Sequence, residues 1–460
     1  MRIHADDTVE VRDDGQKYAL APIAEGENVI KYGFPIGHAT KAIAAGEQVG
    51  PHNLKSNLSG LGDWRYQPYK KPVDGMKKAS FMGYLRADGR VGIRNEIWII
   101  PTVGCAAGVA RLLADRAGDG VKAFSHPYGC SQLGGDLLTT QQVLCGLCRH
   151  PNAGAVLMLG LGCENNGIDR MKEVLGEYDP ERVRFLNLQD CADEMEEGLA
   201  ILAELKTLIA SDERTLQPVS KLAIGVKCGG SDGYSGITAN PLVGLVADRF
   251  ADHGARILMT EIPEAFGAEE ILLSRAVSEA VFDDVAGMIR AFRQYFIAHG
   301  EGIADNPSPG NIAGGISTLE EKSLGCVQKG GKVPLCGALH YGESVPEASG
   351  LYLVDGPGND QVAITNLTAA GAQLILFTTG RGTPLCAPVP TLKISTNTAL
   401  AEKKRHWIDF DAGVLLQGAD GANLSQALLE LCLAVAEGKQ SKGEIGGYTD
   451  IAIFKDGVTL

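Results

Sequence analysis

Long apolar runs, an apolar N-terminus and an excess of basic residues are all missing from this 460-residue sequence. No run of about 18 apolar residues occurs, so no membrane-spanning helix is expected. Residues 1–10 are polar and lack the apolar stretch of a signal peptide, which favours a cytoplasmic protein. The formal net charge is −14, so a nucleic-acid partner, which needs a basic face, is not expected. An anionic small molecule stays compatible with this charge, because a few local cations can outweigh the mean field.

Cofactor-binding glycine motifs are missing too. The glycines within 225–230 form neither a phosphate-binding P-loop nor a dinucleotide fingerprint, so a nicotinamide cofactor is not indicated. The 11 cysteines lack the dense spacing of a disulfide framework. We therefore expect reduced thiols, each a core filler by default and otherwise a metal ligand or a nucleophile.

The sequence that is present predicts an α/β protein with a small N-terminal β domain. Hydrophobic residues make up 45% and charged residues 21%, which suits packed cores. Residues 1–58 alternate short apolar pieces with glycine turns and contain no long helical pattern. The boundaries we expect are a β domain at 1–58, a linker at 59–80, an α/β domain at 81–215 and a second α/β domain at 216–460.

Strands and helices alternate from about residue 81, which predicts βαβ units and mostly parallel sheets. The expected strands are 97–103, 121–124, 155–161, 183–188, 221–227, 256–260, 351–354 and 374–379. The expected helices include 106–117, 135–149, 193–209 and 269–299.

Three predicted loops share one design, in which an apolar strand is followed by glycine, cysteine and polar residues and then by a helix. They centre on Cys130, Cys163 and Cys228, with His126 and Glu164 beside two of them. The carboxyl ends of parallel strands face the same way, so these loops can converge. Thiolate, imidazole and carboxylate together suit a divalent metal such as iron or zinc. An iron–sulfur cluster is a weaker alternative, because the spacing is not a cluster motif.

Further residues in two loops could hold a carboxylate or move a proton. The loop after Cys228 offers Ser231 and Asp232, and Asn240 is expected to cap the next helix. Near Thr383, Arg381 lies between two glycines and could clamp a carboxylate, although a solvated turn arginine is an equally good interpretation. The acids of 261–264 could serve as base or ligand, but solvated loop acids are commoner.

Several stretches together resemble the altronate/galactarate dehydratase family nearly end to end, including an N-terminal β-clip domain of the SAF kind. The tail at 406–413 and the ending at 454–460 are closer to the altronate branch. The stretches that carry the resemblance are 83–95, 126–132, 160–165, 228–241, 306–311 and 379–384.

The resemblance implies dehydration of a sugar acid, in the altronate branch the conversion of D-altronate to 2-keto-3-deoxy-D-gluconate, with iron(II) as the usual metal and manganese as another candidate. This chemistry needs a base for the α-proton, an electrophile for the carboxylate and an acid or metal for the leaving hydroxyl. The roles we expect are catalytic for His126, His52 and Asp232; substrate-binding for Ser231, Asn240, Arg381 and Thr383; and metal-binding for Cys130, Cys163, Glu164 and Cys228.

One departure concerns the N-terminal domain, where relatives carry Gly-His-Lys and this sequence has Gln16 between Gly15 and Lys17. Alternatives therefore stay open: a galactarate dehydratase, a lyase that expels sulfite from a sulfonated hydroxy acid, or a non-catalytic sugar-acid sensor. A small-molecule sugar acid is the expected partner, with no nucleic acid or membrane, and a homo-oligomer is compatible with the sequence. Because His52 and the linker lie together, we expect the N-terminal domain to close over the site.

Overall fold

A computed structural model describes residues 4–69 and 78–460, so part of the predicted linker lies outside the described residues. The chain begins with a small β domain whose two antiparallel sheets share a core that includes the fully buried Val29 and Ile36. One sheet contains β1 (Val9–Val11), β2 (Lys17–Ala19) and β5 (Gln48–Val49), and the other contains β3 (Asn28–Lys31), β4 (Phe34–Ala39) and β6 (Leu54–Lys55).

A four-stranded parallel sheet follows, in the order β10-β9-β11-β12. Helices cover both of its faces, because its central strands are apolar on both sides. Two short hairpin strands and a partner from later in the chain, β7, β8 and β13, form a separate antiparallel sheet beside it. The elements are β7 (Ser80–Leu85), β8 (Val91–Gly92), β9 (Glu96–Pro101), α1 (Ala107–Ala117), β10 (Val121–Ala123), α2 (Gly134–Cys148), β11 (Ala153–Gly160), α3 (Ile168–Leu175), β12 (Val183–Asn187), α4 (Glu194–Ile209) and β13 (Thr215–Pro218).

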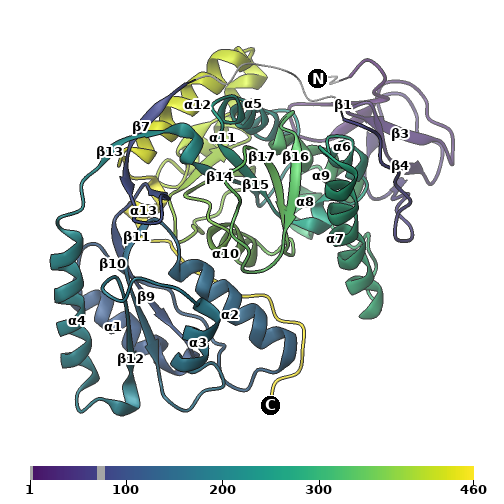
Figure 1. The fold of residues 1–460 in the computed structure, drawn as a ribbon. Helices are drawn as coiled ribbons and strands as arrows, with labels where there is room; N and C mark the ends of the chain where they lie inside the picture. Colours follow the sequence, from purple (N-terminus) through teal and green to yellow (C-terminus); the bar gives the residue numbers. More distant parts are fainter. Residues whose placement is uncertain (1–3, 70–77) are drawn as a thin grey trace.

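The largest unit is built on a seven-stranded parallel sheet in the order β16-β17-β15-β14-β18-β19-β20. Figure 1 shows α5 and α12 on one side of this sheet and α10 on the other. The strands are β14 (Ala223–Cys228), β15 (Arg256–Met259), β16 (Leu335–Leu339), β17 (Gly350–Val354), β18 (Leu374–Thr379), β19 (Thr391–Ser395) and β20 (Phe410–Asp411). The helices are α5 (Ala239–Asp252), α6 (Glu269–Leu273), α7 (Glu279–Ala298), α8 (Pro309–Ala313), α9 (Leu319–Cys326), α10 (Asp360–Ala369), α11 (Thr398–Lys403), α12 (Gly421–Ala436) and α13 (Lys442–Gly446).

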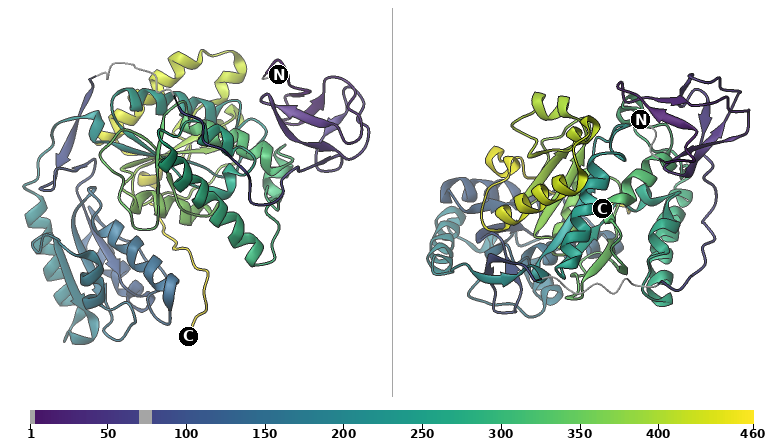
Figure 2. Two further views of the ribbon diagram at one scale, coloured as in Figure 1. Left: turned by 45° about the vertical axis from the view of Figure 1, so that its right-hand side comes forward. Right: turned by 90° about the horizontal axis from the view of Figure 1, so that it is seen from above.

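The two α/β sheets share packing, and the β domain lies at the far end of the largest unit. One apolar cluster joins Trp98 and Val143 of the smaller sheet region to Leu258 and Ile375 of the larger one. Figure 2 shows the β domain and the four-stranded sheet on opposite sides of the seven-stranded sheet. In the described residues, no helix is long and apolar enough to cross a membrane.

The predicted α/β class with a small N-terminal β domain is confirmed, while two local predictions are wrong. The helix expected over 269–299 is two helices, because Ser278 caps α7 by accepting a hydrogen bond from the backbone N–H of Val281. The helix after the Cys228 loop begins at Ala239, so its N-cap is Thr238 and not Asn240. Strands β16, β19 and β20 were not expected.

Candidate functional site

Strand β14 ends at the point where the order of the large sheet reverses. Strands β15, β17 and β16 lie on one side of β14, whereas β18, β19 and β20 lie on the other. In open α/β sheets the crevice outside the carboxyl ends of the strands at such a reversal is the usual ligand site. Cys228 is the last residue of β14, and its loop lies against the loop after β18 because Arg381 N–H donates to the Gly230 carbonyl at 2.9 Å.

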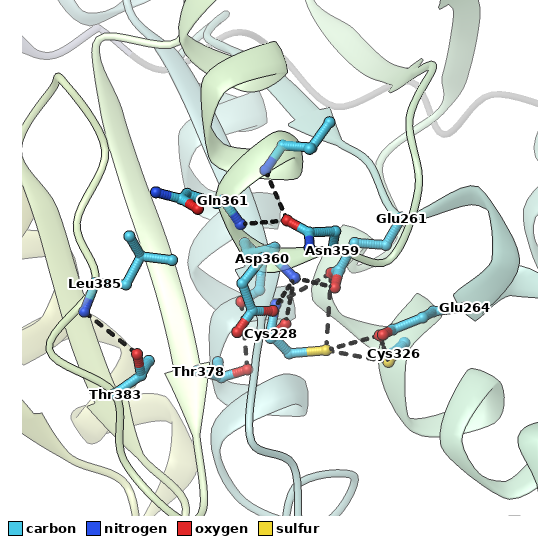
Figure 3. Close-up of polar contacts among 12 residues, drawn as sticks. Cys228, Glu261, Glu264, Cys326, Asn359, Asp360, Gln361, Thr378, Thr383 and Leu385 are labelled. Carbon is cyan, nitrogen blue, oxygen red and sulfur yellow. Dashed lines mark hydrogen bonds and ion pairs between the residues drawn. The ribbon is translucent and has the colours of Figure 1, made fainter. Parts of the chain in front are cut away.

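A buried group of two thiols and a carboxylate lies at this edge. The Sγ atoms of Cys228 and Cys326 are 3.2 Å apart, and they lie 3.3 and 3.2 Å from Oε2 of Glu264. Figure 3 shows these three side chains pointing toward one another, with Glu261 beside them. Among the described residues, no other trio of His, Cys, Asp or Glu brings its ligand atoms within 4.8 Å of one another.

Three buried lysines surround this group. Lys329 Nζ lies 2.9 Å from Cys228 Sγ and 3.3 Å from Glu261 Oε2. Lys322 Nζ donates to Glu264 Oε1 at 2.8 Å. Lys227 pairs with Glu261 and donates to Asp360 Oδ1 at 2.8 Å. Each of these buried lysines therefore contacts a group of opposite charge. Such pairing is needed because burial of an unpaired charge costs much free energy.

These contacts shift the pKa values in opposite directions. The hydrogen bond from Cys326 and the charge of Lys329 overcome burial and lower the pKa of Cys228 to about 6. Burial and the neighbouring Cys228 raise the pKa of Glu261 to about 8. Burial would raise the pKa of Glu264, but Lys322 and its neighbours hold it well below the ordinary value. The cluster therefore combines a thiolate, an ionised carboxylate and a carboxyl group that holds its proton near neutral pH.

The donors of this group fit a divalent metal ion. Two thiols and one carboxylate suit soft or borderline metals, and three protein ligands leave further positions for water or substrate. With Glu261 protonated, the three ammonium groups are balanced by the carboxylates of Glu264 and Asp360 and by the Cys228 thiolate. A divalent ion would therefore add no net charge if Cys326 and Glu261 released their protons. An iron–sulfur cluster fits less well, because the group found among the described residues contains two cysteines, Cys228 and Cys326, and such clusters are held by more.

A narrow cavity lies beside Cys326 and Lys322, and its accessible space of about 10 Å³ is close to that of one water molecule. Residues of the N-terminal domain close one side of it, and the Cys228 loop and α9 form the rest. The lining consists of Lys31, Tyr32, Ser231, Asp232, Ser235, Gly236, Asn240, Ile316, Glu321, Lys322, Gly325 and Cys326.

Glu321 ties the N-terminal domain to this site. Its carboxylate lies 2.8 Å from Lys17 Nζ and 2.7 Å from Lys31 Nζ, and all three groups are buried. Burial opposes ionisation, but the two lysines lower the pKa of Glu321 to about 2. The β domain therefore contacts the α/β core through a buried ionic triad.

The structure separates Cys130 and Cys163 from Cys228. Both are exposed and lie on loops of the four-stranded sheet, whereas Cys228 is buried at the end of the larger one. Glu164 already accepts hydrogen bonds from Thr102 Oγ1 at 2.6 Å and from two backbone N–H groups of its own loop. Among the described residues, Cys130, Cys163 and Glu164 do not belong to the group of ligand atoms within 4.8 Å of one another that contains Cys228.

The two predicted histidines lie away from the cavity. His126 is buried, its Nε2 lies 2.8 Å from the Pro101 carbonyl, and its Nδ1 accepts from Tyr128 N–H at 3.2 Å. Burial also lowers the pKa of His126, which favours the neutral imidazole. Both of its ring nitrogens already have hydrogen-bond partners. His52 is exposed in the N-terminal domain and is not part of the cavity lining.

The residues predicted on the Cys228 loop are near the cavity. Ser231 and Asp232 line it. Burial raises the pKa of Asp232, whose carboxylate accepts from Thr396 Oγ1 at 2.8 Å. Asn240 also lines the cavity, but its amide is engaged by the Gly325 carbonyl at 3.1 Å and by the Thr378 hydroxyl at 2.6 Å.

The predicted anion clamp lies next to the Cys228 loop. Arg381 is exposed, and the Cβ of a side chain at Gly230 would lie 3.6 Å from its Cβ. Thr383 accepts a hydrogen bond from Leu385 N–H at 3.2 Å (Figure 3). Neither residue lines the cavity, so their contact with a substrate stays a prediction.

The sequence did not single out Cys326, Lys322 or Lys329, which lie on α9 and just after it. They fall within 319–331, where every residue of α9 is buried although several are charged, and Lys329 just after it is buried too. A charged stretch without an apolar face is expected to be solvated, so its burial could not be inferred from pattern alone. The acids at 261 and 264 were considered, and the structure buries both.

Three sequence families match consecutive parts of the chain. Residues 2–57 match the altronate/galactarate dehydratase SAF domain. Residues 83–209 match the second domain of D-galactarate dehydratase/altronate hydrolase. Residues 219–459, which carry the thiol group and its lysines, match the C-terminal domain of D-galactarate/altronate dehydratase.

Individual relatives are similar over nearly the whole length. An altronate dehydratase of Escherichia coli (strain K12) is 48% identical over 98% of this chain and 94% of its own length. An altronate dehydratase of Bacillus subtilis (strain 168) is 48% identical over 100% of this chain and 95% of its own length. A galactarate dehydratase (L-threo-forming) of Escherichia coli (strain K12) is 31% identical over 97% of this chain and 90% of its own length.

Proposed function

The chain belongs to the altronate/galactarate dehydratase family of hydro-lyases, and we propose that its substrate is D-altronate, which it converts to 2-keto-3-deoxy-D-gluconate. Two relatives named altronate dehydratase support this choice of sugar acid, since both share 48% of their residues with this chain. The galactarate enzyme is more distant at 31%. Eleven free cysteines are consistent with action in the reducing cytoplasm.

The observation that carries the proposal is the cavity beside the buried thiol group. Its lining includes the buried residues Lys31 and Lys322, whose ammonium groups pair with Glu321 and Glu264, and burial leaves these charges little water to screen them. A sugar acid brings a carboxylate, and its α-proton becomes acidic only when the enediolate charge is stabilised. Two buried cations at one cavity suit that requirement.

Cys228, Glu264 and Cys326 would hold the metal, for which we propose iron(II), with manganese as the second candidate. A bound divalent ion would act there as a Lewis acid toward a substrate oxygen. The chain itself supplies the remaining groups. Asp232 is the proposed base, because burial raises its pKa above that of a solvated carboxyl and Thr396 fixes its orientation. Ser231, on the same loop, is a proposed hydroxyl partner.

The test is an anaerobic assay of the purified protein with iron(II) and, separately, with manganese(II). D-Altronate, galactarate and a sulfonated hydroxy acid are offered in parallel, and 2-keto-3-deoxy acid and sulfite are measured. We expect keto acid from D-altronate with the highest kcat/KM. Release of sulfite alone would replace the proposal with a sulfo-lyase. No product from any of the acids would favour the sensor hypothesis.

A matched pair of variants locates the metal. We expect Cys326→Ser to lose most of the bound iron, because it removes one of two thiolate donors. Cys336→Ser is the control, since Cys336 lies on β16 outside the group. Equal iron content in the two proteins would refute the proposed ligands.

A further inference from the structure

Tyr32 occupies a backbone position that a bulky residue rarely adopts. It is the first residue of the two-residue turn between β3 and β4, where Lys31 pairs with Phe34. Its φ is 60°, and that of the following Gly33 is 78°. Positive φ at both positions matches the tight hairpin turn in which Asn-Gly is favoured, because a large side chain is strained there. Strain retained at such a position often indicates a functional demand on the side chain.

The strained turn brings the phenol of Tyr32 into the cavity. A Cβ built on Gly236 would lie 2.3 Å from the Tyr32 hydroxyl, so the glycine at 236 is what allows the close approach. The Lys31 ammonium lies 4.9 Å from the centre of the Tyr32 ring. Asp232, the proposed base, lines the same cavity from the Cys228 loop. A phenol and a carboxylate therefore face one cavity from two different domains.

We propose that Tyr32 is the general acid that protonates the C3 hydroxyl as it leaves, so that the N-terminal domain completes the active site. This inference rests on the proposed function and adds a catalytic residue to it. A phenol keeps its proton at neutral pH, and burial raises the pKa of Tyr32 further. The neighbouring Lys31 stabilises the phenolate that forms when the proton is given away.

The proton balance is closed within the pocket. Asp232 takes the C2 proton, the C3–O bond breaks, and the departing oxygen takes the phenolic proton and leaves as water. The C2–C3 enol then becomes the keto acid by gaining a proton at C3 and losing one from its C2 hydroxyl. Asp232 gives up its proton and Tyr32 regains one, so neither an oxidant nor a reductant is needed.

A substrate whose leaving group needs no proton separates acid catalysis from packing. The test measures Tyr32→Phe and wild type on D-altronate and on its 3-deoxy-3-fluoro analogue, which expels fluoride. On D-altronate we expect kcat to fall about 100-fold or more, the usual contribution of a positioned acid. On the fluoro analogue we expect loss of no more than about threefold, because fluoride leaves without protonation.

Other outcomes overturn the inference. Equal losses on the two substrates would show that Tyr32 only packs or positions, and unchanged turnover of D-altronate would show that it has no role. A wild-type enzyme that converts neither substrate would refute the proposed function itself. This outcome can be told apart from failure of the Tyr32 proposal, because it does not depend on the variant.

Two further variants distinguish loss of the acid from misfolding of the protein. Gly236→Ala leaves the phenol in the protein but pushes it away, so we expect the same selective loss on D-altronate. Tyr18→Phe is the matched control, because Tyr18 belongs to the same domain but donates to Asp14 at 2.7 Å and does not line the cavity. We expect it to retain full activity on both substrates, and thermal unfolding of each variant confirms that it is folded.

Discussion

Cys163 comes shortly after β11, whereas Cys228 is the last residue of β14, and a polar loop and a helix follow each of them. Around Cys163 the thiol is exposed and accepts only a long hydrogen bond of 3.6 Å from Gln189. Around Cys228 the thiol is buried and meets Cys326, Glu264 and the Lys329 ammonium within 3.3 Å.

The difference shows that a strand-end cysteine becomes a candidate ligand only where other parts of the chain supply its partners. Those partners come from the loop after β15 and from α9, far along the sequence. The lysines offset the free-energy cost of burying the carboxylates and the thiolate, since an unpaired charge would be strongly disfavoured there. The four pairs of variants below test whether this contrast decides function.

The largest effect is expected from the two cysteines themselves. Cys228→Ser should lower kcat/KM at least about 1000-fold, because it removes a proposed metal ligand, and about 4 kcal/mol of transition-state stabilisation goes with it. Cys163→Ser should stay within about threefold of wild type, since its thiol makes no short contact. Steady-state assays at the same added concentration of iron(II) measure both. A large loss of activity in Cys163→Ser would instead indicate that the exposed loop of Cys163 belongs to the metal site.

The next effect concerns the buried ionic triad that holds the N-terminal domain. Glu321→Gln leaves Lys17 and Lys31 buried without a countercharge and should destabilise the protein by about 3 kcal/mol. Urea denaturation and limited proteolysis between the domains measure this. The control is Glu173→Gln on α3, whose exposed pair with Arg170 should contribute less than about 1 kcal/mol. Equal losses of stability in the two variants would contradict the proposed difference between the buried triad and the exposed pair.

The same triad predicts an acid sensitivity. Glu321 has a folded-state pKa of about 2 against an ordinary value of 4.5. A lowered carboxyl pKa stabilises the folded state fully above 4.5, and this stabilisation is lost as the pH falls from 4.5 to about 2. Wild type should therefore lose docking of the N-terminal domain across that window. Glu321→Gln should lack this part of the pH dependence, which proteolysis at stepped pH would show.

The sequence predicted the α/β fold and the Cys228 loop, which forms one side of the candidate site. The strand ending at Cys228 could be predicted because a short apolar run precedes a glycine-rich loop, and β14 confirms it. Cys326 and Lys329 could not be found this way, because nothing local in a charged stretch signals burial. Tyr32 was missed for a different reason, since its importance lies in a backbone φ of 60° that the sequence alone does not display.

A smaller effect should follow from removing the cation beside the buried thiol. In metal-free protein, thiolate absorbance should rise with a midpoint near pH 6 from Cys228, whose pKa the hydrogen bond from Cys326 and the charge of Lys329 lower. Lys329→Met should move that transition to higher pH and reduce kcat by about 10- to 100-fold, as the loss of a group that supports a ligand does. Lys403→Met, an exposed lysine on α11, is the control. Persistence of the pH 6 transition in Lys329→Met would rule out the proposed pairing.

The smallest effect compares two strained residues, one from each region. Tyr32 beside the cavity and Ser131 beside Cys130 both have positive φ, 60° and 58°. Glycine relieves this strain at both positions, so Ser131→Gly should stabilise the fold by up to about 1 kcal/mol. Tyr32→Gly also removes a ring that packs against the core, so it should give no such gain. Thermal unfolding would measure both effects. Only Tyr32→Gly should lose activity on D-altronate, because only Tyr32 reaches the cavity. If Ser131→Gly lost activity equally, strain at the exposed loop would also be serving catalysis, and the two regions would have to be treated as one site.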